Sequence, residues 1–190
     1  VCILDRDSRF YGVFGSIGED DGQFVYATAI ALDSAGYVYV SDEHTQRISV
    51  FGPSGEFLYK WGTPGAASGQ INGPCGLAFD AQDNLYVTDH LNSRVQKFTR
   101  EGGHLMSFGA RGDGEGEFNL PWGLTVAPDG DVYVADWRND RVQRFSPDGV
   151  FVASYGGSGH TDGRFHRPSS VAVCRSSAKM GLLRGVEYLM

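Results

Sequence analysis

Apolar residues in this chain occur in short runs of four to seven, and several of these runs alternate with polar residues. Residues 131–136 read DVYVAD, and residues 141–145 read RVQRF. Runs this short, rich in β-branched and aromatic residues, predict β-strands, because a helix needs apolar residues three and four positions apart over a longer window. The tripeptide Pro-Asp-Gly at 128–130 predicts a tight hairpin turn before the first of these strands.

This strand pattern repeats at a spacing of 47 residues. Residues 29–51, 76–98 and 123–145 share one order of apolar, turn and charged positions. In each copy an Asp is followed by an Arg and then by a Phe at the same spacing. The three sets are Asp42, Arg47 and Phe51; Asp89, Arg94 and Phe98; and Asp136, Arg141 and Phe145. Self-similarity at such a period is the signature of a repeat architecture.

Each unit predicts four antiparallel strands. In the third copy the strands are expected at 123–127, 131–136, 141–145 and 150–156. Pro-Asp-Gly turns and a loop at 137–140 join these strands, and a glycine-rich connector at 157–168 leads onward. A four-stranded meander of about 40 to 50 residues matches one blade of a β-propeller. We therefore predict an all-β fold, a β-propeller built from four-stranded antiparallel blades with a 47-residue repeat.

The motifs within each unit resemble the NHL repeat. They are F-x-x-P-x-G-L, then D-G-x-V-Y-V-x-D, then N-x-R-V-Q-x-F, followed by an Asp-Gly turn and a terminal Phe-Gly. The best copy runs from Gly116 to Gly156, and the resemblance covers roughly residues 10–173. NHL repeats usually form six-bladed propellers, whereas this chain holds about four units. The first unit departs from the pattern, with Ala27 and Ala29 where Pro and Gly are expected and Thr45 in place of an Asn.

We treat the chain as one propeller domain divided by the repeat. The segments are 1–15 (the last two strands of an incomplete blade), 16–62, 63–109 and 110–156 (three NHL-like repeats), 157–174 (the start of a further repeat) and 175–190 (a divergent tail). Residues 185–190, GVEYLM, could pair with the N-terminal strands and close a ring of four blades. Alternatively, the chain is a fragment of a six-bladed protein, as its start at Val1 rather than Met suggests. We favour the fragment, because the tail matches the repeat poorly.

Charge and motifs disfavour several function classes. The formal net charge is −7, from 23 acidic and 16 basic residues, which disfavours binding to a nucleic-acid backbone. Cys2, Cys75 and Cys174 show no metal spacing and are expected to be buried or idle thiols. There is no P-loop, GxSxG, HExxH or Cys-x-x-Cys motif, so we expect no catalytic residues, cofactor or metal. We find no signal peptide and no apolar run near the roughly 18 to 20 residues of a membrane span, and localisation stays open.

Two repeated features resemble functional sites, but neither has the residue pattern that such a site requires. The Asp and Arg of each unit recur throughout, which favours a structural role in satisfying loop amides. These residues are Asp42, Arg47, Asp89, Arg94, Asp136 and Arg141. The acidic connectors at 18–23 and 112–117 lack the ligand spacing of an EF-hand calcium loop, and we expect them to be solvated turns.

One face of the predicted propeller should carry the binding site. The loop between strands two and three and the connectors between blades lie on the same side, around the mouth of the central channel. The candidate residues on this loop face are Tyr26, His44, His90, Trp122, Trp137, Arg138, His166 and Arg167. The tryptophans do not recur in the other units, and large aromatics beside Arg are typical of interaction hot spots. Packing against a neighbouring blade is the alternative for each Trp, and exposed loop positions are the alternative for each His.

We therefore predict a non-catalytic scaffold that binds a protein or peptide on its loop face. One alternative is RNA binding or substrate recognition, as in NHL domains of ubiquitin-ligase-type proteins, which the net charge disfavours. Another is a metal-dependent lyase or hydrolase on a propeller, which would need His and carboxylate ligands from several blades. We expect no membrane contact. Further blades, from an oligomer or a longer parent chain, could complete the ring.

Overall fold

The computed structural model describes residues 1–4, 7–174 and 181–182. Three four-stranded antiparallel sheets dominate it, each built from one unit of the repeat. The first sheet holds β5 (Ala27–Leu32), β6 (Val38–Asp42), β7 (Arg47–Phe51) and β8 (Phe57–Trp61). The second holds β9 (Pro74–Phe79), β10 (Leu85–Asp89), β11 (Arg94–Phe98) and β12 (His104–Phe108). The third holds β13 (Leu124–Val126), β14 (Val132–Asp136), β15 (Arg141–Phe145) and β16 (Phe151–Gly156).

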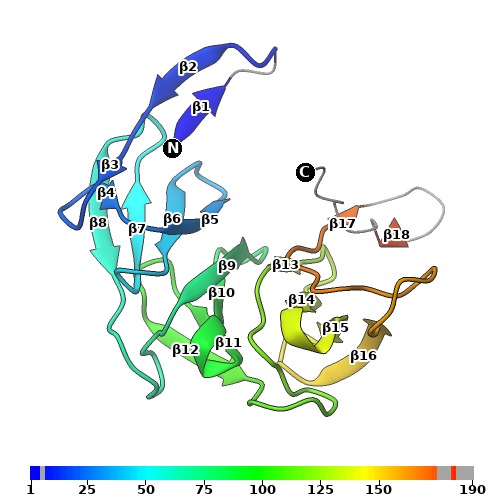
Figure 1. Ribbon diagram of the computed structural model, residues 1–190. Coiled ribbons are helices and arrows are strands. Elements are labelled where there is room, and N and C mark those ends of the chain that lie inside the picture. Colours follow the sequence, from blue (N-terminus) through cyan, green and yellow to red (C-terminus); the bar gives the residue numbers. More distant parts are fainter. Residues whose placement is uncertain (5–6, 175–180, 183–190) are drawn as a thin grey trace.

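Shorter strands complete the described chain. Two-stranded sheets are formed by β1 (Cys2–Leu4) with β2 (Phe10–Val13), by β3 (Ser16–Ile17) with β4 (Gln23–Phe24), and by β17 (Val173–Cys174) with β18 (Gly181–Leu182). The β1–β2 sheet and the β17–β18 sheet are separate and lie at opposite ends of an arc (Figure 1). The tail segment 185–190, which would close the ring in the less favoured of the two alternatives, lies outside the described residues.

The sheets stand side by side along this arc like the blades of a propeller. The first strands, β5, β9 and β13, line the inside of the arc, and the last strands lie toward its outer rim (Figure 1). Neighbouring first strands contact one another, β5 with β9 and β9 with β13. The predicted all-β propeller fold with four-stranded antiparallel blades is confirmed.

The apolar core lies between neighbouring sheets rather than within one. One cluster joins Tyr39 and Ile48 of the first sheet to Leu77 and Leu85 of the second. Another joins Tyr86 of the second sheet to residues of the third, including Val132, Val134 and Phe145. Because each sheet buries an apolar surface against the next, the apolar pattern must recur in every unit.

The repeated Phe of each third strand holds neighbouring sheets together. Its ring packs on an aromatic at the end of the last strand of the preceding unit or directly after it. The centroid distances are 4.7 Å for Phe14–Phe51, 5.0 Å for Trp61–Phe98 and 4.8 Å for Phe108–Phe145. The glycine after that aromatic is also required: Gly109 has φ +87°, and a Cβ there would lie 2.3 Å from the Phe118 ring.

The strand boundaries follow the sequence prediction closely, with one local difference. The four-residue loop at 137–140 contains one turn of 3₁₀ helix, η2 (Trp137–Asn139), and the second sheet has η1 (His90–Asn92) at the same place. Both turns end at a residue in the left-handed conformation, Ser93 or Asp140, which sends the chain back into the third strand. In the described part of the chain no helix is long and apolar enough to cross a membrane.

Candidate functional site

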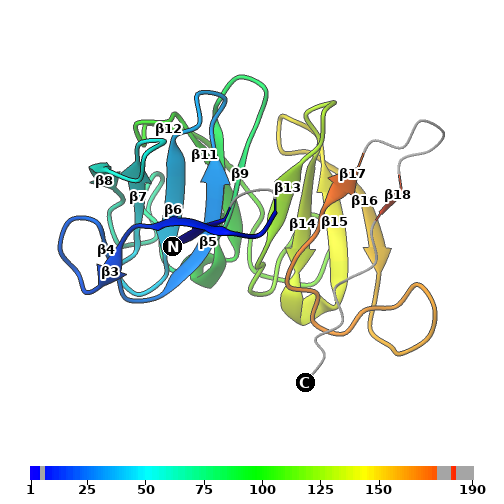
Figure 2. The same cartoon turned by 90° about the horizontal axis from the view of Figure 1, so that it is seen from above.

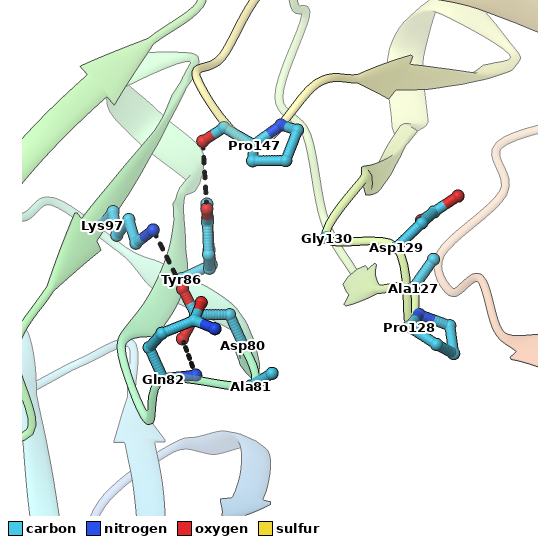
Figure 3. Close-up of a pocket in the computed structure, with 10 residues that line it drawn as sticks. All are labelled: Asp80, Ala81, Gln82, Tyr86, Lys97, Ala127, Pro128, Asp129, Gly130 and Pro147. Carbon is cyan, nitrogen blue, oxygen red and sulfur yellow. Dashed lines mark hydrogen bonds and ion pairs between the residues drawn. The ribbon is translucent and has the colours of Figure 1, made fainter.

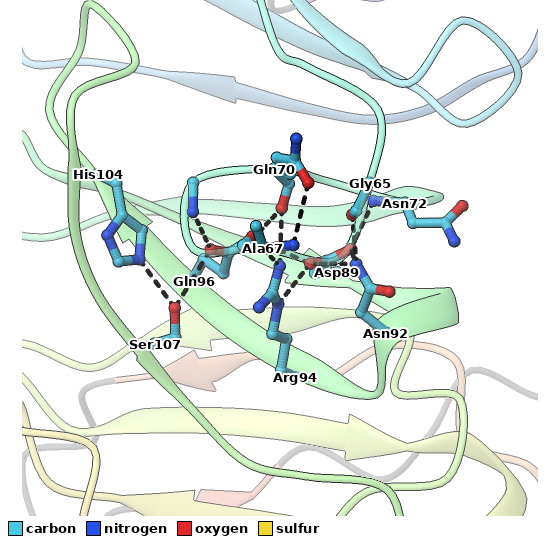
Figure 4. A network of polar contacts seen from close by, with 11 residues as sticks. Gly65, Ala67, Gln70, Asn72, Asp89, Asn92, Arg94, Gln96, His104 and Ser107 are labelled. Carbon is cyan, nitrogen blue, oxygen red and sulfur yellow. Dashed lines mark hydrogen bonds and ion pairs between the residues drawn. The ribbon is translucent and has the colours of Figure 1, made fainter.

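Asp89 lies at the end of β10 and organises the loop that follows it (Figure 4). Its side chain is buried, and its carboxylate accepts a hydrogen bond from the Asn72 backbone N–H at 2.7 Å. Three side-chain donors also reach it: Asn92 Nδ2 at 2.9 Å, Arg94 Nε at 2.7 Å and Gln96 Nε2 at 2.9 Å. The carboxylate therefore ties strands β10 and β11 to the connector that enters β9.

The third sheet repeats this arrangement around Asp136. The carboxylate accepts from the Asn119 backbone N–H at 2.8 Å, from Asn139 Nδ2 at 2.8 Å and from Arg141 Nε at 2.8 Å. Gln143 Nε2 completes the set at 3.1 Å. Two units with the same side chains thus make the same contacts, and both oxygens of each Asp accept hydrogen bonds from the unit itself.

The first sheet satisfies its Asp differently. Asp42 accepts backbone N–H groups from Val25 at 2.7 Å, Tyr26 at 3.2 Å, His44 at 3.0 Å and Thr45 at 3.1 Å. Burial alone would raise the pKa of this carboxyl, but the backbone donors outweigh it and hold the pKa below its usual range. The departure at Thr45 thus changes the donors but keeps the Asp ionised and occupied.

The Arg of each unit binds the glycine-rich connector through backbone carbonyls. Arg141 donates to the carbonyls of Asp113, Gly114 and Glu117 at 2.7 to 2.8 Å. Arg94 and Arg47 make similar bonds to the earlier connectors. In a calcium loop such carbonyl oxygens would point toward the ion. Here they accept hydrogen bonds from a guanidinium. The residues that the structure describes contain no group of three or more His, Cys, Asp or Glu placed to hold a metal ion.

An aromatic cluster lies on the loop face where the second and third sheets meet. The His90 ring packs edge-on against Trp122, with centroids 4.9 Å apart, and Trp122 lies 6.0 Å from Trp137. His90 Nδ1 donates to the carbonyl of Pro121 at 3.0 Å, since a carbonyl can only accept. His90 is 5% exposed, whereas both tryptophans are half-buried. His90 therefore packs on the buried side of the cluster, and the two tryptophans are partly exposed to solvent.

Two arginines flank Trp137. The Arg138 guanidinium lies 5.2 Å from the centroid of the Trp137 ring, and the Arg167 guanidinium lies 5.1 Å from it. Arg138 belongs to η2 of the third sheet, whereas Arg167 belongs to the next connector, so segments far apart in sequence meet at this ring. Both arginines are exposed. In Figure 2, η2 and the connector that follows β16 project toward the same side of the molecule.

Asp140 fixes the segment that carries Arg167. Its Oδ1 accepts the Arg167 backbone N–H at 2.7 Å and lies 4.0 Å from His166 Nδ1. Burial would raise the pKa of Asp140, but the Arg167 N–H, the Ser158 side chain and the nearby positive charges lower it. Sequence reasoning missed Asp140. Its signal was the change from Gln46 and Ser93 at the equivalent positions.

Tyr26 and His44 belong to the same face but not to this cluster. Tyr26 is exposed, and its carbonyl accepts the Glu43 backbone N–H at 3.0 Å. His44 Nε2 lies 3.8 Å from a Glu19 carboxylate oxygen on the first connector. Among the described residues no aromatic or cation–π contact links either side chain to the tryptophans.

The structure thus brings five of the eight candidates into contact: His90, Trp122, Trp137, Arg138 and Arg167. His166 joins their edge through Asp140. The alternative of an exposed loop position is wrong for His90. It is buried where Trp122 and Pro121 cover it, since η1 folds back onto the segment that enters β13.

A small cavity of about 170 Å³ lies elsewhere, between the hairpin turns of the second and third sheets (Figure 3). Three of its polar side chains are already paired: Lys97 Nζ lies 2.9 Å from Asp80, and the Tyr86 hydroxyl donates to the Pro147 carbonyl at 3.3 Å. Burial would lower the pKa of Lys97, but Asp80 and Tyr86 raise it above its usual value. Sequence reasoning did not indicate this cavity, because its lining comes from turns of two different units.

Comparison with known proteins identifies two of the three repeats. The NHL repeat model matches residues 72–98 and 118–145, which include the Asp89 and Asp136 networks. The E3 ubiquitin-protein ligase TRIM71 of Bos taurus is 43% identical over 47 residues, which make up 25% of this chain and 5% of that protein. The Gallus gallus TRIM71 is 42% identical over 47 residues. The chain therefore contains NHL repeats, and it matches only a small part of these longer relatives.

Solved structures share the fold at low sequence identity. A streptogramin B lyase structure superposes with a TM-score of 0.62 and 17% identity, over 88% of this chain and 50% of that one. XC5397 from Xanthomonas campestris, described as a gluconolactonase, gives a TM-score of 0.63 and 18% identity, over 96% of this chain and 61% of that one. These likenesses establish the fold alone, because one fold hosts unrelated functions.

Proposed function

We propose that this NHL-repeat propeller is a non-catalytic scaffold that binds a protein or peptide segment on its loop face. The observation that carries the proposal is the half-buried Trp122–Trp137 pair with exposed arginines beside it. Rings of this kind offer a large contact area at a low entropy cost, and a buried His fixes one of them from below.

Ligand binding is assigned to the loop side chains, because the repeated Asp and Arg residues already have partners within the protein. The Asp89 and Asp136 carboxylates accept hydrogen bonds from donors of their own blades, and Arg94 and Arg141 also donate to backbone carbonyls of the connectors. The loops are thereby held in one conformation before a ligand arrives. Preorganisation of this kind favours binding, because less conformational freedom is lost on association.

Two other functions are alternatives to a protein-binding scaffold. The TRIM71 match supports RNA binding or substrate recognition within a ligase, and tryptophan with arginine can also stack on bases. The net charge of −7 opposes this alternative. A metal-dependent enzyme is the other alternative, because the fold also occurs in a lyase and a gluconolactonase, but the described residues offer no cluster of three or more metal-ligating side chains.

The proposal can be tested by selecting ligands for the purified 190-residue chain from a displayed library of random twelve-residue peptides. Recovered peptides are measured by fluorescence anisotropy against the wild type and a Trp122→Ala/Trp137→Ala variant. Loss of a hot-spot side chain costs about 2 kcal/mol or more, so we expect at least a thirtyfold weaker Kd. A Gln82→Ala variant at the opposite cavity is the control and should bind normally. Failure to recover any peptide that depends on the tryptophans would overturn the proposal.

A further inference from the structure

We propose that the segment bound on the loop face is acidic, with carboxylates that pair with Arg138 and Arg167 beside an apolar residue that covers Trp122. This inference rests on the proposed function and narrows the class of its partner. It follows from the state of the two arginines in the free protein.

Neither guanidinium has a carboxylate partner in the part of the chain that the structure describes. The Arg167 charge helps to lower the pKa of Asp140, but Asp140 accepts the backbone N–H of Arg167, lies beside His166 and forms no ion pair with the Arg167 guanidinium. In contrast, Arg94 and Arg141 are both paired with a buried Asp at 2.7 to 2.8 Å. The exposed arginines on the loop face therefore keep their hydrogen-bonding capacity for a ligand.

Trp137 fixes the position of both charges. A guanidinium that stacks on an aromatic ring keeps its in-plane N–H groups free, and these N–H groups match the two oxygens of a carboxylate. Arg138 and Arg167 lie at nearly equal distances from the same ring, 5.2 and 5.1 Å. One short segment with two acidic residues can therefore meet both guanidinium groups without rearranging the site.

The surrounding charges favour a short acidic peptide over a long polyanion. Asp113 and Glu115 are exposed on the connector that enters the third sheet, close to Arg141. Glu19 and Asp21 lie on the first connector, where they pair with His44 and Lys60. A nucleic-acid backbone that extended across this face would meet these carboxylates, whereas two carboxylates held at the arginines would not.

The apolar part of the ligand is assigned to Trp122. This ring is half-buried, rests on His90 and stands beside the Trp137 ring at 6.0 Å. A carboxylate at the arginines places the neighbouring ligand residue over the two tryptophans, where an apolar side chain gains contact area. The site therefore recognises an acidic ligand residue that is next to an apolar one.

The experiment uses the peptides selected on the 190-residue chain and measures their composition, affinity and salt dependence. We expect enrichment in Asp and Glu beside Leu, Phe or Trp. Replacing these carboxylates with Asn or Gln should weaken binding at least tenfold. Arg138→Gln and Arg167→Gln should each weaken it by a similar factor, Arg138→Lys should recover only part of the loss, and Arg111→Gln is the charge-matched control. Thermal unfolding of each variant confirms that it is folded.

The outcomes separate this inference from the proposed function. Peptides that need Trp122 and Trp137 but lack acidic residues, and that bind the Arg138→Gln and Arg167→Gln variants normally, would overturn the acidic class and leave the scaffold standing. Tighter, Arg-dependent binding of a mixed-sequence twelve-nucleotide RNA would replace the peptide with a nucleic acid. Failure to select any Trp-dependent peptide would overturn both.

Discussion

Arg94 donates a hydrogen bond from Nε to Oδ2 of Asp89 at 2.7 Å, and the two residues face each other across strands β10 and β11. Asp42 and Arg47 face each other in the same register in the first sheet, yet they make no such bond. Arg47 Nε has no hydrogen-bond partner among the described residues. The same two residue types in the same register therefore make different contacts, according to the side chains around them.

Asp89 is predicted to be essential for the stability of the second sheet. Asp89→Ala leaves the Arg94 charge and the amides of Asn92 and Gln96 without their acceptor, because all three donate to this carboxylate. Breaking a buried pair from one side typically costs about 3–5 kcal/mol. Urea unfolding of the variant should show a loss of this size, and Glu115→Ala on an exposed connector should change little. A loss below about 1 kcal/mol would contradict this role.

The first sheet is predicted to gain stability when it is given the side chains of the other two. Ser49 takes the place of Gln96 and Gln143, and its buried Oγ has no partner. On the adjacent strand it faces Lys60, whereas Gln96 faces Ser107. Ser49→Gln combined with Lys60→Ser should therefore fit, and should add about 1 kcal/mol to the free energy of unfolding.

The matched comparison for this variant is Ser49→Gln alone, which must share its space with Lys60. We expect a smaller gain or none, because the long Lys side chain stands where the other sheets have a Ser. Thermal and urea unfolding measure both variants. A double variant less stable than the wild type would mean that the network of the second sheet cannot be transferred.

Stability is predicted to fall in acid, in part through Asp42. The pKa of this carboxyl is lowered in the folded protein, so the unfolded chain binds more protons at pH values near and below about 4. The stabilisation is therefore present above that range and is lost as pH falls through the folded pKa. Asp42→Asn should show a shallower decrease in the free energy of unfolding between pH 5 and pH 2. An unchanged slope would contradict the contribution, and Glu115→Gln is a suitable control.

The flank of the first sheet predicts self-association of the 190-residue chain. Ile30 is 49% exposed, whereas Leu77 and Leu124 at the same position of the other sheets are 7% and 8% exposed, because a preceding sheet covers them. Light scattering on a size-exclusion column should detect species larger than the 20.6 kDa monomer. Ile30→Ser with Leu32→Ser should shift the distribution toward the monomer. A monodisperse folded wild-type monomer, verified by circular dichroism, would contradict the prediction.

Several features of the fold could be predicted because they depend on local order. Strand β15 spans the predicted residues 141–145, and the Pro-Asp-Gly turns fall where hairpins were expected. The repeated Asp and Arg, for which a structural role was predicted, face each other in every four-stranded sheet, since the register follows from the loop length. The predicted loop at 137–140 contains a 3₁₀ turn that the sequence pattern did not indicate, and within this turn the Arg138 backbone N–H donates to the Asn119 carbonyl of the connector.

The amino-acid sequence alone determined the repeat, the four-stranded unit and the face on which the loops lie, because alternation and turn chemistry act within about ten residues of each position. Only the tertiary structure decided that His90 is buried under Trp122 and that Arg138 and Arg167 meet at Trp137. Arg138 is the sequence neighbour of Trp137, whereas the His90–Trp122 and Arg167–Trp137 contacts join different units of the repeat. Their distances depend on how neighbouring sheets are placed along the arc, a relationship that no local pattern encodes.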